Sequence, residues 1–174
     1  MPAIFLNTGS GLGRLLSLRF ISFLIFSLVE IQAIGQTANP DGSAGLRLNE
    51  VNSHAARHFL SHYAAASGVR WIRDDQFYIA CFNSDHSRTR VHYTNDGHFS
   101  FCTIYYREDA LDGNLKLAIV KKFPGCQILT VTELTDDLYK KAFFVNIKNG
   151  RHLETLRCDS EGIEVTEDIK DAGI

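Results

Sequence analysis

The chain has 174 residues, 45% of them hydrophobic, and carries a formal net charge of −2 at pH 7. A protein of this length and apolar content can build the core of one domain or of two fused halves. The charge balance does not indicate a nucleic-acid partner, because such a partner requires a clustered basic surface. We therefore expect no nucleic-acid binding.

The N-terminus has the order of a secretory signal. Arg14 and Arg19 supply positive charge, residues 20–29 form an apolar run, and small residues follow as a cleavage site. A membrane-spanning helix needs about 20 apolar residues, and Glu30 ends this run too early. We predict a signal peptide over residues 1–35, with an uncleaved membrane anchor as the alternative. After its removal we expect no membrane span and a periplasmic or secreted protein.

A short linker precedes the first predicted element. Residues 36–47 are rich in Gly, Ala, Asn and other residues typical of loops, so we predict a flexible segment. Residues 49–66 then have the spacing of an amphipathic helix, which Asn49 or Asn52 can cap. The apolar side chains of this helix recur at every fourth position: Val51, Ala55, Phe59 and Tyr63. Four strands are predicted to follow, over residues 69–73, 76–83, 87–94 and 98–106.

The second half repeats this order. Shifting the numbering by 65 places residues 78–97 on residues 143–162, and both segments end in an acidic residue followed by Gly. A helix is predicted over residues 111–123, because Pro124-Gly125 ends its apolar stripe. Strands are predicted over residues 128–134, 140–148, 151–159 and 162–167.

The duplicated order predicts an α+β fold. We expect tandem α-β-β-β units that form an antiparallel sheet, with the helices packed on one face of it. The domain is assigned to residues 48–168, with the first unit over 48–107 and the second over 108–168. Residues 169–174 are predicted to be a frayed tail.

Four cysteines raise the question of disulfides in an exported protein: Cys81, Cys102, Cys126 and Cys158. Cys81 and Cys102 lie on predicted strands separated by a third strand, so they are about 9–10 Å apart. A disulfide needs Cα atoms within about 7 Å, and the same argument separates Cys126 from Cys158. We expect four buried or half-buried thiols. A pairing between the halves, such as Cys102 with Cys126, stays open.

Several segments resemble one known family. They are Leu111 with the run 119–128 (Ile-Val-Lys-Lys-Phe-Pro-Gly-Cys-Gln-Ile), residues 56–59 followed by 69–71, and residues 89–93 followed by Asp96-Gly97. Together they resemble PepSY-like proteins, also described as β-lactamase-inhibitor-like, over about Leu48–Asp168. The first half departs from the pattern, since residues 64–68 (Ala-Ala-Ala-Ser-Gly) stand where an aromatic residue and Pro are expected. This departure puts the end of the first helix in doubt.

The resemblance carries expectations about fold and role. It implies tandem α-β-β-β units, a periplasmic or cell-surface location and no cofactor. The wider group is associated with binding or restraining peptidases, which implies a protein or peptide partner in the envelope. It supplies no agreed catalytic residues to carry over to this sequence.

The first predicted helix carries three histidines that are spaced by four residues. His54, His58 and His62 form a line on the flank of its apolar stripe. Histidines with this spacing can share a Zn²⁺ ion, although the Glu of a metalloprotease motif is missing and Arg57 opposes a cation. The alternative interpretation is a solvated helix face.

A second candidate site is a basic and aromatic surface on the predicted sheet. Arg88, Arg90 and His92 alternate along one strand, so they share one face. With Arg70 and Trp71 nearby, they can form a recognition surface, because Trp and Arg dominate interface hot spots. The alternative is the ordinary water-facing side of an antiparallel sheet.

After residue 35 the sequence contains neither a motif typical of a catalytic nucleophile nor a Gly-rich phosphate-binding loop. We therefore expect a non-enzymatic, exported module that binds a protein or peptide and restrains a peptidase or another envelope protein. The alternatives are a metal-binding or enzymatic protein that uses the His54, His58 and His62 line, and a structural envelope protein. The oligomeric state is not indicated by the sequence.

Overall fold

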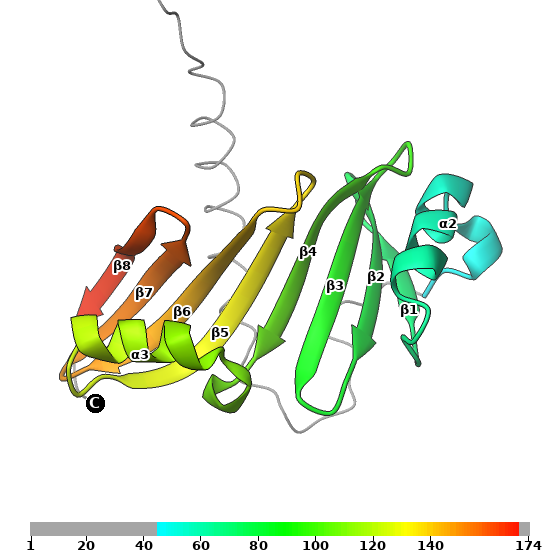
Figure 1. The fold of residues 1–174 in the computed structure, drawn as a ribbon. Helices are drawn as coiled ribbons and strands as arrows, with labels where there is room; N and C mark the ends of the chain where they lie inside the picture. Colours follow the sequence, from blue (N-terminus) through cyan, green and yellow to red (C-terminus); the bar gives the residue numbers. More distant parts are fainter. Residues whose placement is uncertain (1–44, 171–174) are drawn as a thin grey trace, which may run out of the picture. The chain divides into compact units, whose positions relative to one another are not determined.

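The computed structural model describes residues 45–170 (Figure 1). The predicted signal peptide, linker residues 36–44 and tail residues 171–174 lie outside the described residues. Within the described part no helix is long and apolar enough to cross a bilayer.

Eight antiparallel strands form one sheet in which every strand pairs with the next along the sequence. Their bounds are β1 Arg70–Arg73, β2 Phe77–Asn83, β3 Ser87–Thr94, β4 Phe99–Tyr106, β5 Gln127–Asp136, β6 Lys141–Asn149, β7 His152–Asp159 and β8 Gly162–Lys170. Within residues 45–170 two α-helices accompany them, α2 Ser53–His62 before β1 and α3 Gly113–Lys122 between β4 and β5. Single 3₁₀ turns, η2 Leu48–Glu50 and η3 Glu108–Ala110, precede the helices.

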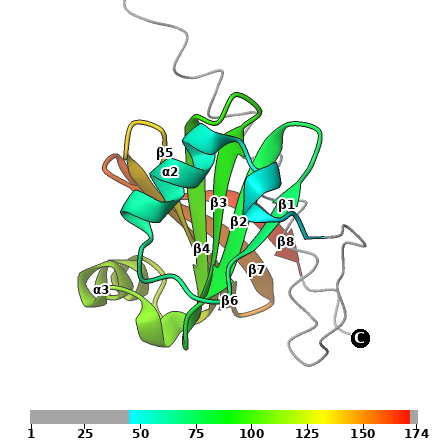
Figure 2. The ribbon, with the colours of Figure 1, turned by 90° about the vertical axis from the view of Figure 1, so that its right-hand side faces the viewer.

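Both helices lie on the same face of the sheet, as Figures 1 and 2 show. The alternation of side chains along β4 explains this arrangement. Cys102 and Ile104 pack in the core beneath α2, and Tyr106, on the same face of the strand, packs in the core beneath α3.

The predicted fold class is wrong. Four strands follow each helix, which agrees with the predicted strand ranges but not with α-β-β-β units. β4 pairs with β5 from Phe101↔Asp136 to Tyr106↔Val131, so all eight strands belong to one continuous sheet. Two ten-residue helices beside eight strands make a sheet-rich fold, not a balanced α+β fold of tandem units. The physical reason for the low helix content is that Asn52 and Asp112 cap the helices late, and Tyr63 and Phe123 end them with a non-helical backbone. The sheet is continuous because of its edges. Two separate units would each expose an unpaired edge, and the β4–β5 pairing removes both.

The core beneath α2 is aromatic. Ala55 and Phe59 of α2 are 0% and 3% exposed, and Phe59 meets Trp71 of β1 edge-on with ring centroids 5.3 Å apart. Trp71 in turn lies 5.8 Å from the ring of Tyr93. The helix begins at Asn52, whose side chain accepts a hydrogen bond from the backbone N–H of His54, as an N-cap residue should.

The core beneath α3 is aliphatic. Ile119 of α3 packs with Val131, Val145 and Leu156, which come from three different strands. Asp112 caps this helix by accepting hydrogen bonds from the backbone of Asn114 and Leu115.

None of the four cysteines, all of which lie in the described residues, forms a disulfide. Cys81, Cys102 and Cys158 are buried and Cys126 is half-buried, as the strand geometry predicted.

Candidate functional site on the helix-free face

Within residues 45–170 no helix covers the face of the sheet opposite α2 and α3, here called the helix-free face (Figures 1 and 2). This face is built from alternate residues of each strand. The register identifies its cross-strand rows. One row runs Arg70, Cys81, Arg90, Thr103, and a second runs Ile72, Ile79, His92, Phe101. Arg88 pairs with Tyr105 in a third. The first half of this face therefore carries a polar row between an apolar row and the Arg88–Tyr105 pair.

The apolar row contains a buried histidine. The His92 ring stacks on Phe101 with centroids 4.1 Å apart and planes 15° apart, and Phe77 meets both rings edge-on. His92 is only 9% exposed. Burial, reinforced by the charge of Arg90, lowers the pKa of His92 to about 3. The imidazole is therefore neutral at physiological pH.

Two arginines stand side by side in β3 without a carboxylate. Arg88 and Arg90 lie two residues apart on one face, and neither has an acidic partner within residues 45–170. Partial burial and, next, the charge of Arg90 lower the pKa of Arg88. Arg157 in β7 shows the usual arrangement, because it forms ion pairs with Asp159 and Glu164. The Arg88–Arg90 pair is thus a positive site that no described residue neutralises.

Three buried polar atoms on this face have no hydrogen-bond partner among the described residues. They are Nε of Arg90, Nδ1 of His92 and Oγ1 of Thr103. Arg90 and Thr103 are direct cross-strand partners, and His92 is two residues from Arg90 on the same face. Unsatisfied buried polar atoms are uncommon in native proteins, and three in neighbouring positions require an explanation.

Solved structures share this architecture. A DUF2874 family protein from Bacteroides ovatus ATCC 8483 aligns with a TM-score of 0.56 and 17% identity, over 69% of this chain and 87% of that protein. A BLIP-like protein from Bacteroides fragilis NCTC 9343 aligns with a TM-score of 0.55 and 12% identity, over 71% of this chain and 89% of that protein. The protein therefore has a BLIP-like fold.

A further structure with this BLIP-like fold comes from Bacteroides eggerthii DSM 20697, in a protein provisionally assigned to the periplasm. It has a TM-score of 0.53 and 18% identity, over 69% of this chain and 88% of that protein. No family model and no curated protein sequence matches the chain. At these identities the likeness concerns the fold alone.

The BLIP-like sheet brings four of the five predicted binding residues to one face. Arg70, Arg88, Arg90 and His92 lie on the helix-free face. Trp71 lies on the other face, where it is 5% exposed and belongs to the core beneath α2. The sequence could have excluded Trp71, because Trp71 directly follows Arg70 in one strand and adjacent residues of a strand point to opposite faces.

The predicted site did not include Thr103, Phe101 or Tyr105. These residues reach the site through the β3–β4 register, which shifts by one residue between His92 and Tyr93. The sequence shows which side chains of each strand share a face. A β-bulge, however, changes which residues of two neighbouring strands lie opposite each other. No feature of the sequence alone places Thr103 beside Arg90.

The histidine line of α2 divides into a pair and a separate residue. His58 and His62 stack with centroids 4.0 Å apart, while the His54 ring lies near His98, at 6.5 Å. Nδ1 of His62 is 2.9 Å from the backbone oxygen of His58. Within residues 45–170 no group of three His, Cys, Asp or Glu side chains is placed to hold a metal ion.

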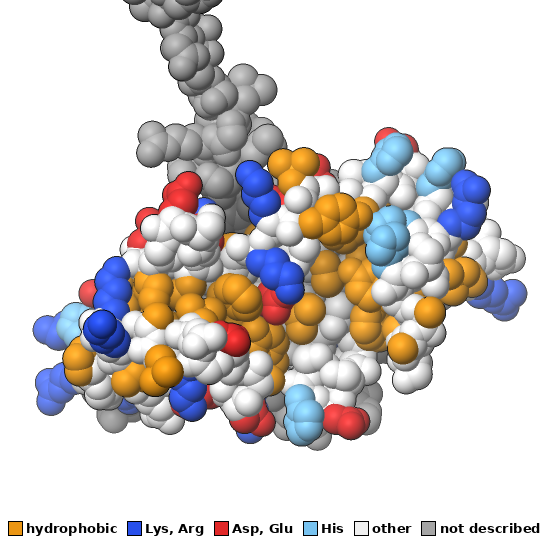
Figure 3. Space-filling view, viewed as in Figure 1, with side chains coloured by type: hydrophobic (Ala, Val, Ile, Leu, Met, Phe, Trp, Pro, Cys, Tyr) orange, Lys and Arg blue, Asp and Glu red, His pale blue; other side chains and the backbone are white. Residues whose placement is uncertain are grey.

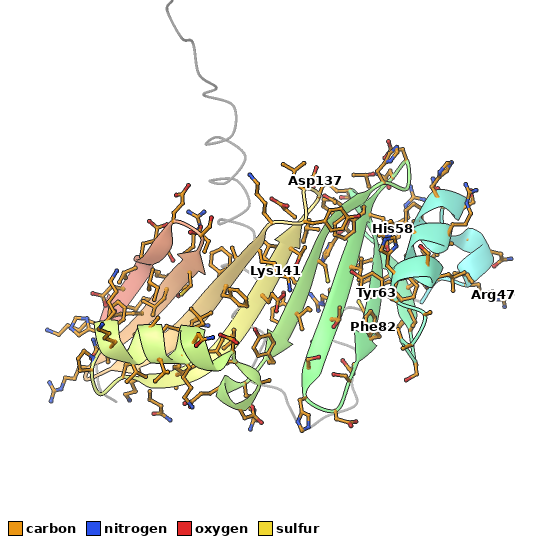
Figure 4. All side chains as sticks on the ribbon, in the orientation of Figure 1. Arg47, His58, Tyr63, Phe82, Asp137 and Lys141 are labelled. Carbon is orange, nitrogen blue, oxygen red and sulfur yellow. The ribbon has the colours of Figure 1, made fainter. Side chains whose placement is uncertain are left out.

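The helix-covered face offers a competing surface between α2 and α3. Figure 3 shows apolar side chains there with a few charged ones among them, and Figure 4 labels Lys141 in this strip and Tyr63 beside Phe82 near α2. Lys141 pairs with Glu133 at 2.6 Å, and Tyr63 and Phe82 pack with centroids 5.7 Å apart. The Lys141 and Glu133 charges neutralise each other, unlike those of the Arg88–Arg90 pair.

Proposed function

We propose that the protein is an exported, non-enzymatic binding module of the PepSY-like group, which captures a protein or peptide partner through the helix-free face. The observation that carries this proposal is the Arg88–Arg90 pair, two neighbouring guanidinium groups without a carboxylate among the described residues. Two like charges on one strand face destabilise the free protein. An acidic partner would relieve that repulsion.

The side chains around the pair suit a protein interface. Arg and Tyr are enriched among residues that dominate binding energy, and Arg88 lies directly across from Tyr105. Unpaired surface arginines also raise the association rate with a partner of opposite charge. Export is supported by the signal-like N-terminus, and the periplasmic assignment of the Bacteroides eggerthii protein agrees with it.

The proposal is tested by capture with charge variants. The full-length protein with a C-terminal tag is the bait in an envelope extract, and the retained protein is identified and then titrated against the bait by calorimetry. Arg88→Glu/Arg90→Glu is expected to weaken binding at least about tenfold, which corresponds to 1.4 kcal/mol. Arg107→Glu/Arg151→Glu is a matched control, because these arginines are exposed and lie off this surface.

The control must bind like the wild type, and both doubly substituted proteins must retain the wild-type melting temperature. Equal affinity of all three proteins would contradict the proposal. Arg88→Gln/Arg90→Gln removes charge without reversing it, so it separates loss of attraction from new repulsion.

A further inference from the structure

The unsatisfied polar atoms of the helix-free face form a contiguous group. Thr103 is 2% exposed and lies between Arg90 on β3 and Leu134 on β5. His92 follows Arg90 by two residues, so its side chain is the next on that face. Arg90 Nε, Thr103 Oγ1 and His92 Nδ1 therefore come from neighbouring side chains rather than from scattered positions.

These atoms cannot easily find partners by moving. The His92 ring is held between Phe101, stacked at 4.1 Å, and Phe77, edge-on at 5.6 Å. Thr103 is β-branched and only 2% exposed, which restricts its rotation. Leaving such groups unpaired is unfavourable, and an arrangement that is retained despite this cost is typical of a preorganised binding site.

The three unsatisfied polar atoms favour a ligand that is an oxygen-containing anion. Nε of Arg90 can only donate a hydrogen bond, and the Thr103 hydroxyl can donate a second. The neutral His92 adds a nitrogen that can donate or accept, according to its tautomer. Arg88 supplies a further positive charge beside them. The two donors come from paired residues of adjacent strands, and a carboxylate has two oxygens that can accept hydrogen bonds. A charged acceptor makes such bonds stronger.

We propose that Arg90 Nε, Thr103 Oγ1 and His92 Nδ1 form a subsite for one carboxylate group of the captured partner, with Arg88 at its margin. The carboxylate is that of an Asp or Glu side chain or of a polypeptide C-terminus. This inference rests on the proposed function for its natural ligand, but the subsite itself can be tested without any partner.

The test follows the arginine Nε–H signals of the ¹⁵N-labelled full-length protein by NMR during titration with sodium acetate. Sodium chloride at equal ionic strength is the control titration. The Arg90 signal is expected to shift to saturation with acetate and not with chloride. The Arg157 signal should not respond, because Arg157 already has carboxylate partners.

Variants of Thr103 show whether the hydroxyl takes part. Thr103→Val keeps the shape of the side chain and removes the donor, so it should raise the acetate Kd by about tenfold. Thr103→Ser keeps the hydroxyl and should bind acetate like the wild type. N-acetyl-glutamate amide and N-acetyl-alanine then distinguish a side-chain carboxylate from a C-terminal one.

An Arg90 signal that responds equally to acetate and chloride would overturn the subsite, as would unchanged acetate affinity in Thr103→Val. Saturation by inorganic phosphate but not by acetate would also overturn it. The two proposals fail separately. Partner capture without acetate binding would contradict only the subsite, whereas acetate binding with no Arg88/Arg90-dependent partner would contradict only the proposed function.

Discussion

The hydroxyl of Tyr93 lies 3.1 Å from Nδ1 of His58, and this contact joins the C-terminal end of β3 to the middle of α2. Tyr93 is fully buried, and the His58 ring is enclosed by Phe99 on one side and His62 on the other. The second ring nitrogen of His58, Nε2, is buried and has no hydrogen-bond partner within residues 45–170. Burial and the nearby His62 lower the pKa of His58. The Tyr93 hydroxyl thus supplies the one side-chain hydrogen bond of that ring among the described residues.

Replacing Tyr93 with Phe should destabilise the fold by about 1 kcal/mol, because it removes this hydrogen bond and leaves both His58 nitrogens unsatisfied. Urea denaturation of the full-length protein measures the loss. Tyr78→Phe is the matched control, since Tyr78 is also buried, at 8% exposed, but no hydrogen bond of its hydroxyl is found within residues 45–170. Equal losses for the two variants would show that the Tyr93–His58 bond contributes nothing.

His92 should make the stability of the fold depend on pH. Its pKa is about 3 in the folded protein and near 6.5 when unfolded, so the unfolded protein binds the proton first as the pH falls. Its contribution is complete above pH 6.5 and is lost progressively down to about pH 3. The expected loss from pH 7.5 to pH 5 is roughly 2 kcal/mol.

His92→Phe tests this pH dependence. Phe can keep the stacking contact with Phe101 but cannot titrate. The free energy of unfolding of wild type and variant is measured from pH 7.5 to pH 5 by urea denaturation. The carboxylates titrate in both proteins, so their effect cancels in the difference. Parallel curves for the two proteins would contradict a neutral, buried His92.

The sequence predicted the elements well because each has a strong local pattern. Residues 76–83 form an apolar run and appear as β2 Phe77–Asn83, and residues 98–106 appear as β4 Phe99–Tyr106. The sequence predicts the first helix over residues 49–66, but α2 spans only Ser53–His62. The predicted start is too early because η2 occupies Leu48–Glu50 and Asn52 caps the helix. The predicted end is too late because Tyr63 has a non-helical backbone.

The sheet and the site depend on non-local pairing, which local patterns do not contain. The β4–β5 contact, which joins the two halves, connects residues such as Cys102 and Thr135 that are distant in the sequence. The arginine alternation of β3 was visible from the sequence. The position of Thr103 beside Arg90 depends on the register of two strands and on the bulge at His92/Tyr93.

The four thiols should differ in reactivity. Cys126 is half-buried, whereas Cys81, Cys102 and Cys158 are buried. Burial raises the pKa of Cys126, and it raises the pKa of Cys102 and of Cys158 to about 11, so the greater exposure of Cys126 distinguishes it. Because the thiolate is the reactive form, one thiol should react with a disulfide reagent at pH 8 well before the others. Mass spectrometry after brief labelling should locate the label on Cys126. Cys126→Ser should abolish the fast phase, and an equal rate at all four positions would show that the sheet opens readily.

The turn between β3 and β4 should tolerate no side chain at Gly97. This residue has φ 90°, a conformation that favours Gly, and a Cβ there would meet the Asn52 side chain and lie 2.9 Å from Cβ of His54. Asn52 is the N-cap of α2 and also donates a hydrogen bond to the backbone oxygen of Asn95. Gly97→Ala should therefore cost the backbone strain, about 1 kcal/mol, and also part of the cap, about 1 kcal/mol more.

Gly150 provides the matched control for this turn. It has φ 61° in the β6–β7 turn, and no atom lies within 4 Å of an added Cβ. Gly150→Ala should therefore lose only the strain contribution, and thermal or urea unfolding of both variants measures the difference. Far-ultraviolet circular dichroism should also show a loss of helix in Gly97→Ala alone, because only that substitution displaces the cap. If the two variants unfold alike, the contact between the β3–β4 turn and the start of α2 does not stabilise the fold.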